Sequence, residues 1–150
     1  MAPIFRSCGP LSLRTACFLI AFYTFALAIL LLSLNAHDYY YASQYMVWSR
    51  IISFVFAVVL FFAAICLLGG LNRNSRQLHN VWILAFGVFI IYQVSSIAWN
   101  IYYYTDAYNP VPVVVRSSML SNIIVNGLLV FLNVLCLITV HSHRETIIGL

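Results

Sequence analysis

The sequence contains no lysine and very little charge of either sign. Charged residues make up 7% of its 150 residues and hydrophobic residues 64%, whereas soluble domains are about 25% charged and 45–50% apolar. The only acids are Asp38, Asp106 and Glu145. The basic charge comes from seven scattered arginines, and nucleic-acid binding needs a clustered basic face. The composition therefore excludes an ordinary soluble domain and a nucleic-acid partner, and it predicts a chain that lies in lipid.

The sequence also lacks the residue patterns that carry chemistry. It has no nucleophile–base arrangement, no glycine-rich phosphate loop and no set of His and Cys ligands at metal-binding spacing. His141-Ser-His143 resembles a metal-binding pair, but nothing near it completes a site, so we predict a solvated turn beside the membrane. We therefore expect no enzyme activity, no catalytic residue, no metal and no cofactor.

Four long apolar segments contain no acidic or basic residue. They cover about residues 15–34, 51–71, 81–103 and 118–140, and about 20 helical residues suffice to cross a bilayer. The first segment is longer than a signal-peptide core of about 7–15 residues, so we expect it to be retained. The fold predicted is all-α: a single tetraspan domain over residues 1–150, built as an antiparallel four-helix transmembrane bundle. Its outer loops would be 35–50 and 104–117, and its cytoplasmic loop 72–80.

Arginine counting predicts the orientation of this bundle. Cytoplasmic loops of membrane proteins carry an excess of Lys and Arg. Both termini and the 72–80 loop would share one side, and they hold five arginines against two on the other side: Arg6, Arg14, Arg73, Arg76 and Arg144 against Arg50 and Arg116. We therefore expect both termini in the cytoplasm.

Tyrosine is concentrated in the two outer loops and at their edges. Each loop has a Tyr-Tyr-Tyr triplet and a further tyrosine four residues on: Tyr39, Tyr40, Tyr41 and Tyr45, then Tyr102, Tyr103, Tyr104 and Tyr108. Tyr and Trp prefer the headgroup level, so one interpretation is an interfacial aromatic belt. The cytoplasmic edge has little beyond Trp82, and this asymmetry favours a second interpretation, a contact surface for a partner protein.

Amide side chains form a stripe on each of the last two helices. Gln93, Ser96 and Asn100 follow i, i+3, i+7 spacing, and Asn122, Asn126 and Asn133 follow i, i+4, i+11 spacing. Antiparallel packing would bring Asn100 near Asn122 and Gln93 near Asn126. Hydrogen bonds between these helices are one interpretation. A polar pathway for a solute is the other, and it is disfavoured because no intramembrane acid, His or Lys accompanies the stripe.

The cysteines and the C-terminus suggest attachment to lipid and to scaffolds. Neither outer loop contains a cysteine, so no extracellular disulfide is expected. Cys8 lies just before the first apolar segment and is a palmitoylation candidate. Ile148 and Leu150 give the C-terminus the apolar pattern that a PDZ groove captures by strand addition.

The stretch around the first membrane entry carries a resemblance. Cys8, followed by Ser12, Leu13, Arg14 and Thr15, resembles the start of small insect four-span transmembrane proteins of the pasiflora-like group. That group is loosely similar to lysosome-associated four-span transmembrane proteins. Ala16 stands where this group has glycine, and the tail lacks the Pro-Tyr sorting signals of the lysosomal proteins.

This resemblance implies a component of septate junctions, the paracellular barrier of insect epithelia and glia. We therefore expect a non-catalytic protein of the lateral plasma membrane whose partners are the lipid bilayer, other membrane proteins and, in one version, further copies of itself. One alternative is a trafficking or regulatory protein of endolysosomal membranes. A second alternative is a small channel or transporter subunit.

Overall fold

The structure, a computed structural model, consists of four long helices. It describes residues 12–41, 47–105 and 113–148. The helices are α1 (Leu13–Tyr41), α2 (Val47–Arg73), α3 (Arg76–Thr105) and α4 (Val113–Ile148). The prediction of an all-α four-helix bundle is confirmed, and each helix is long and apolar enough to cross a membrane.

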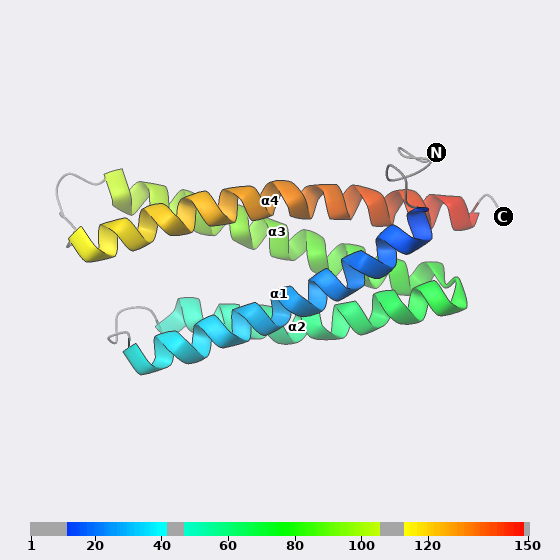
Figure 1. The fold of residues 1–150 in the computed structure, drawn as a ribbon, viewed down its shortest axis with the longest axis horizontal. Coiled ribbons are helices and arrows are strands. Elements are labelled where there is room, and N and C mark those ends of the chain that lie inside the picture. The colour runs from blue at the N-terminus through cyan, green and yellow to red at the C-terminus, as the bar shows by residue number, and fades with distance from the viewer. Residues whose placement is uncertain (1–11, 42–46, 106–112, 149–150) are drawn as a thin grey trace.

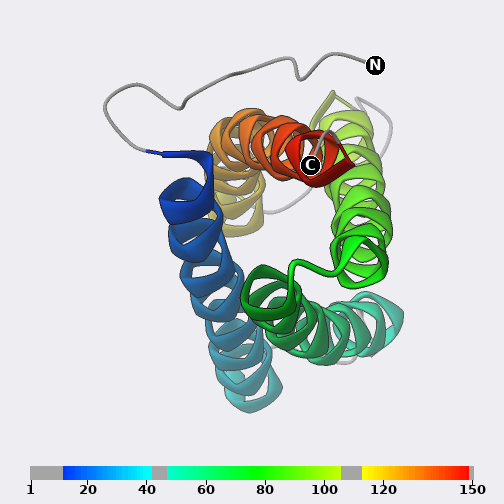
Figure 2. The same cartoon turned by 90° about the vertical axis from the view of Figure 1, so that its right-hand side faces the viewer.

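The helices form two antiparallel hairpins, α1 with α2 and α3 with α4 (Figure 1). Contacts close the ring through α2 with α3 and through α1 with α4, and the α1–α4 contact is the smallest of the four. The start of α1, the α2–α3 turn and the end of α4 lie together at what we call the terminal end (Figure 1). At the opposite end, the loop end, the two hairpins diverge, as both views show (Figures 1 and 2).

The tightly packed core lies in the half nearer the terminal end. Its largest fully buried side chains are aromatic and aliphatic: Trp82, Phe86, Phe89, Leu60 and Leu67. The Trp82 and Phe86 rings stack with centroids 4.4 Å apart. Small side chains allow the helices to approach one another here, because Ala21, Ala28, Ala57 and Ala64 are completely buried.

Local hydrogen bonds cap the start of α1 and the end of α2. Ser12 caps α1, since its Oγ accepts from the Thr15 N–H at 3.3 Å and its carbonyl from the Ala16 N–H at 3.0 Å. After α2, Asn74 has a left-handed backbone (φ 47°). The Ser75 N–H then bonds the Gly70 carbonyl at 3.0 Å, which is the Schellman arrangement. The turn into α3 is therefore short and fully specified.

The helices extend further than the expected membrane spans. Tyr39–Tyr41 are the last residues of α1, and Tyr102–Tyr104 lie in the last turn of α3, so neither triplet is in a loop. No glycine or proline between residues 34 and 41 interrupts α1, and a backbone near lipid satisfies its own polar groups best as helix. Helix α4 begins at Val113, directly after Pro112, a residue that cannot donate to a preceding turn.

The outward faces of all four helices carry large apolar side chains. Leu84, Leu128, Phe131 and Ile91 are each about two thirds exposed or more. Isolated soluble proteins rarely present apolar surface of this extent. The chain is therefore a multi-pass membrane protein whose outward faces contact lipid.

Candidate functional site: polar side chains along the core faces

A three-residue hydrogen-bond network joins three helices near the middle of the bundle. The Tyr23 hydroxyl of α1 donates to Asn133 Oδ1 of α4 at 2.6 Å. Asn133 Nδ2 donates to Gln93 Oε1 of α3, also at 2.6 Å. Asn133 is fully buried and Gln93 is 4% exposed, so these bonds form away from water.

The network corrects one expected pairing on the amide stripes. Asn100 does lie opposite Asn122, because its Nδ2 donates to Asn122 Oδ1 at 3.2 Å. Gln93, however, bonds Asn133 and not Asn126. In the antiparallel register that pairs 100 with 122, position 93 faces 129, between the two asparagines, and the long Gln93 side chain reaches the later one.

The remaining amides form a partly exposed cluster toward the loop end. Asn126 Nδ2 turns back to its own helix, donating to the Asn122 carbonyl at 3.1 Å and to Asn122 Oδ1 at 2.7 Å. Asn100 also donates to the Ser96 carbonyl at 3.0 Å. Asn122 is on the stripe that faces the core at Asn133, yet it is exposed. The divergence of the hairpins at this end accounts for that exposure.

Trp82 carries a second polar contact between the hairpins. Its Nε1–H donates to Thr24 Oγ1 of α1 at 3.3 Å, and Thr24 in turn donates to the Ile20 carbonyl at 2.8 Å. Both side chains are completely buried. Trp82 is therefore a core residue that spans α3 and α1, and not part of an interfacial belt.

Two histidines meet at the terminal end. His143 Nδ1 lies 3.2 Å from His79 Nε2, and the rings are nearly parallel, with centroids 5.2 Å apart. His79 Nδ1 lies 2.8 Å from the Ser75 carbonyl. His79 is fully buried and His143 is 7% exposed. The expectation of a solvated turn at 141–143 is wrong, because α4 continues through these residues and turns His143 into the bundle.

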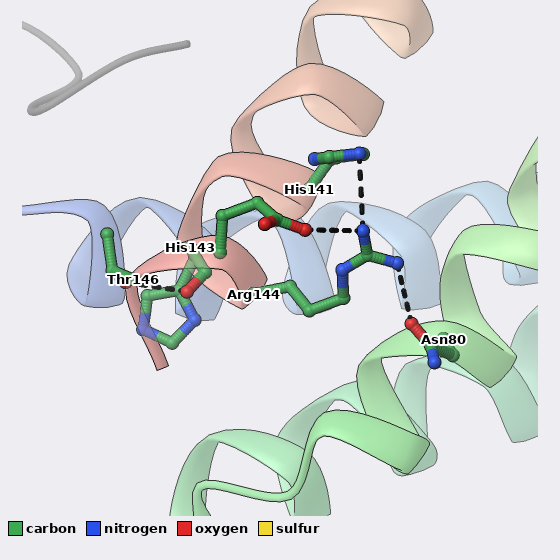
Figure 3. Close-up of polar contacts among 6 residues, drawn as sticks. Asn80, His141, His143, Arg144 and Thr146 are labelled. Carbon is green, nitrogen blue, oxygen red and sulfur yellow. Dashed lines mark hydrogen bonds and ion pairs between the residues drawn. The ribbon is translucent and has the colours of Figure 1, made fainter. Parts of the chain in front are cut away.

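Arg144 ties the end of α4 to the start of α3 (Figure 3). Its Nη1 donates to Asn80 Oδ1 at 2.8 Å, and its Nη2 contacts Glu145 Oε1 at 2.6 Å and His141 Nε2 at 3.3 Å. Two buried atoms here, His141 Nδ1 and Arg144 Nε, have no hydrogen-bond partner among the described residues. Arg144 is thus held at the protein surface by three different side chains.

The loop end of α3 presents aromatic rings. Trp99 and Tyr102 are 60% and 65% exposed, and both rings contact Tyr103, with centroids 5.1 and 5.6 Å apart. The Arg116 guanidinium of α4 lies 4.7 Å from the centroid of the Tyr104 ring. We call Trp99, Tyr102, Tyr103 and Tyr104 the aromatic ledge. Tyr45 and Tyr108 lie outside the described residues, as do the side chains of Tyr39–Tyr41.

The structure describes only some of the cysteines and C-terminal residues that the sequence analysis singled out. Cys17 and Cys136 belong to the hydrophobic core, whereas Cys8 lies outside the described residues. Helix α4 continues to Ile148, and Leu150 lies beyond the described residues. Strand addition of this tail into a groove would require the last turn of α4 to unwind.

These arrangements can bind hydrogen-bonding groups or protons. No group of three or more His, Cys, Asp or Glu side chains that could hold a metal ion occurs among the residues that the structure describes.

The histidine pair and Trp82 were not predicted as functional residues. A signal was present, since His79, Trp82, Phe86 and Gln93 recur at helical spacing on one face of α3.

Comparison with known proteins places the chain beside none of them. No protein-family model, no curated protein and no solved structure matches it.

Proposed function

We propose that this multi-pass membrane protein is a non-catalytic assembly component of cell junctions, of the septate-junction type, in the lateral plasma membrane. It acts by lateral association with other membrane proteins and through the tyrosines at the loop end, which lies on the side opposite the cytoplasm. The resemblance at Cys8 and at Ser12–Thr15 supports the junction class, and the aromatic ledge supports the mode of contact.

The exposure of the aromatic ledge is the observation that carries this proposal. Trp99 and Tyr102 are more than half exposed, although neighbouring rings support them. Tyr and Trp offer large, rigid contact area at low conformational-entropy cost. Rings at this level also suit the lipid interface, so an experiment must separate partner binding from anchoring.

Alanine substitutions on one helix make that separation. Tyr102→Ala and Trp99→Ala should abolish recruitment of the tagged protein to junctions while leaving its insertion and amount unchanged. Leu84→Ala is the matched control, because Leu84 is 71% exposed on the same helix but lies near the opposite end. Loss of correct insertion in the ledge variants, with normal recruitment of the correctly inserted fraction, would reduce the ledge to an anchor.

Imaging of the unmodified chain tests the compartment. A tag at the N-terminus, viewed in a polarised insect epithelium beside junctional and lysosomal markers, should give a lateral junctional belt. Signal confined to acidic vesicles would instead favour the endolysosomal alternative.

The finer proposals concern attachment. Acylation of Cys8 would add a lipid anchor beside α1, and a Cys8→Ser variant that incorporates as much of a palmitate analogue as the wild type would exclude this site. Ile148 and Leu150 would engage a PDZ scaffold, and deletion of Leu150 should then release the protein from it. The chain also associates with further copies of itself, through the apolar outward faces of its helices.

A small channel or transporter subunit is the second candidate function. The observation that favours it is the exposure of Asn122 on the same stripe as the buried Asn133. A solute pathway would need a polar entrance that water can reach, such as Asn122, leading to the buried amides of Asn133 and Gln93. Reaction of Asn126→Cys and Asn133→Cys variants with an aqueous thiol reagent would support this pathway.

A further inference from the structure

The histidine pair sits where three helices and a turn converge. His79 belongs to the first turn of α3, and His143 to the last two turns of α4. A Cβ on Gly70 of α2 would come within 2.9 Å of His79 Nδ1, so α2 packs directly against the ring. Any change in the charge of this pair acts on the contact between the end of α4 and the α2–α3 turn.

The contacts determine which ring nitrogens carry protons. A backbone carbonyl only accepts, so the Ser75 carbonyl requires a proton on His79 Nδ1. The neutral His79 ring then has an unprotonated Nε2, and His143 must donate to it from Nδ1. His143 Nε2 is therefore the ring nitrogen of the pair that is left to take up a proton.

The two protonation steps affect the hydrogen bond differently. A first proton on His143 Nε2 leaves the Nδ1–H···Nε2 bond in place. A second proton has to bind His79 Nε2, which would then be a donor facing another donor, and the bond breaks. Both steps place positive charge in a buried site.

The surrounding charges oppose proton uptake from two sides. Arg14 of α1 acts on His143, and Arg144 of α4 acts on His79, each by charge repulsion. Arg14 itself donates to the Leu71 carbonyl at the end of α2, at 3.3 Å. Glu145 contacts Arg144, Arg73 of α2 and Arg76 of α3 are exposed, and α2 meets the pair with backbone at Gly70.

We propose that His79 and His143 form a proton-binding site that holds the end of α4 against the α2–α3 turn when neutral and loosens this contact when both rings are protonated. This site is independent of the aromatic ledge and of the junctional function. Its ligand is the proton. Acidification on the side of the terminal end would weaken the contact of α4 with the α2–α3 turn at His143, while the Arg144–Asn80 hydrogen bond remains.

Nitrogen NMR of the full-length protein in lipid nanodiscs tests the site directly. The chain has four histidines, so ¹⁵N-histidine labelling gives few signals. At about pH 8, above the usual range of histidine titration, a scalar coupling should be visible between His143 Nδ1 and His79 Nε2. Because burial and the neighbouring charges oppose both protonation steps, it should persist at about pH 5 and disappear at about pH 3, where both rings are protonated. His79→Gln should remove it at all pH values, and His141→Gln should leave it intact.

Thermal unfolding supplies the second readout. The unfolding midpoint of the wild type should fall by at least about 2 °C on acidification, because the unfolded chain binds protons that the buried pair excludes. His143→Asn retains a donor near the Nδ1 position but cannot take up the proton, so its fall should be smaller, whereas His141→Asn should behave as wild type. Absence of the coupling at about pH 8, persistence of the coupling at about pH 3, or equal falls in the two Asn variants would each overturn the proposal.

Discussion

The Tyr23 hydroxyl donates to Asn133 Oδ1 at 2.6 Å across a separation of 110 residues. This bond connects α1 to α4, the pair of neighbouring helices with the smallest contact. Asn133 passes the connection on to Gln93 of α3. Hydrogen bonds between membrane helices contribute about 0.6–2 kcal/mol each, so this network supplies a directional link where packing is weakest.

Removal of Asn133 should destabilise the bundle more than removal of Tyr23's hydroxyl. Asn133→Leu leaves both Gln93 and Tyr23 without their partner, and we expect a loss of about 1–3 kcal/mol in the free energy of unfolding. Tyr23→Phe removes one bond and should cost about 0.6–2 kcal/mol. Reversible unfolding in mixed micelles measures both.

A double variant checks that the two residues act together. Because the two residues share one hydrogen bond, Tyr23→Phe should cost little in an Asn133→Leu background. Asn126→Leu is the matched control, because the hydrogen bonds that Asn126 donates to Asn122 stay within α4, and it should cost less than Asn133→Leu. Additive losses for Tyr23 and Asn133 would contradict the link.

Two adjacent glycines at the end of α2 should respond differently to alanine. A Cβ on Gly70 would lie 2.9 Å from His79 Nδ1 and 3.1 Å from Leu78 Cβ. His79 cannot turn away without losing Ser75 and His143, so Gly70→Ala should cost about 1–3 kcal/mol. A Cβ on Gly69 would meet only Leu78 Cδ1 at 3.5 Å.

Gly69→Ala is therefore the control for this pair. An ordinary contact combined with better helix propensity should leave it neutral or stabilised by up to about 1 kcal/mol. The measurement is the thermal midpoint of each variant under one condition. Equal midpoints for the two alanine variants would mean that His79 does not pack on Gly70.

Two tryptophans of α3 offer a similar comparison. Trp82 is completely buried and Trp99 is 60% exposed. Trp82→Ala should cost about 3–5 kcal/mol, since it leaves a cavity beside Phe86, and it also removes the hydrogen bond that Trp82 donates to Thr24. Trp99→Ala should cost far less. Unfolding of the two variants, followed by circular dichroism, would contradict this assignment if Trp99 were the more costly.

Composition and periodicity predicted the helices well and their ends poorly. Uncharged apolar runs long enough for a bilayer have few alternatives to helix, so the four spans follow directly. The ends depend on local geometry: α1 continues through Tyr41 because nothing stops it, whereas α2 ends where Asn74 adopts a left-handed backbone.

The sequence predicted which helix face each polar side chain lies on, but it did not predict its hydrogen-bond partner. Helical spacing placed Gln93 and Asn133 on facing stripes, yet side-chain length and helix crossing decided that they bond each other. The histidine pair was harder to predict, because His79 and His143 come from helix ends that spacing alone does not bring together. Their meeting depends on the short Asn74 turn and on the bare backbone of Gly70.

Cysteine accessibility along the amide stripe should separate packing from a solute pathway. In a background without the native cysteines, Asn122→Cys should react with an aqueous thiol reagent, because Asn122 is exposed near the loop end. Asn133→Cys should stay protected, because position 133 is completely buried against α1 and α3. Asn126→Cys, lying between them, reports how far water enters. Reaction at 122 alone fits a bundle closed by the Tyr23–Asn133–Gln93 network, whereas equal reaction at all three positions requires a hydrated pathway and favours the channel.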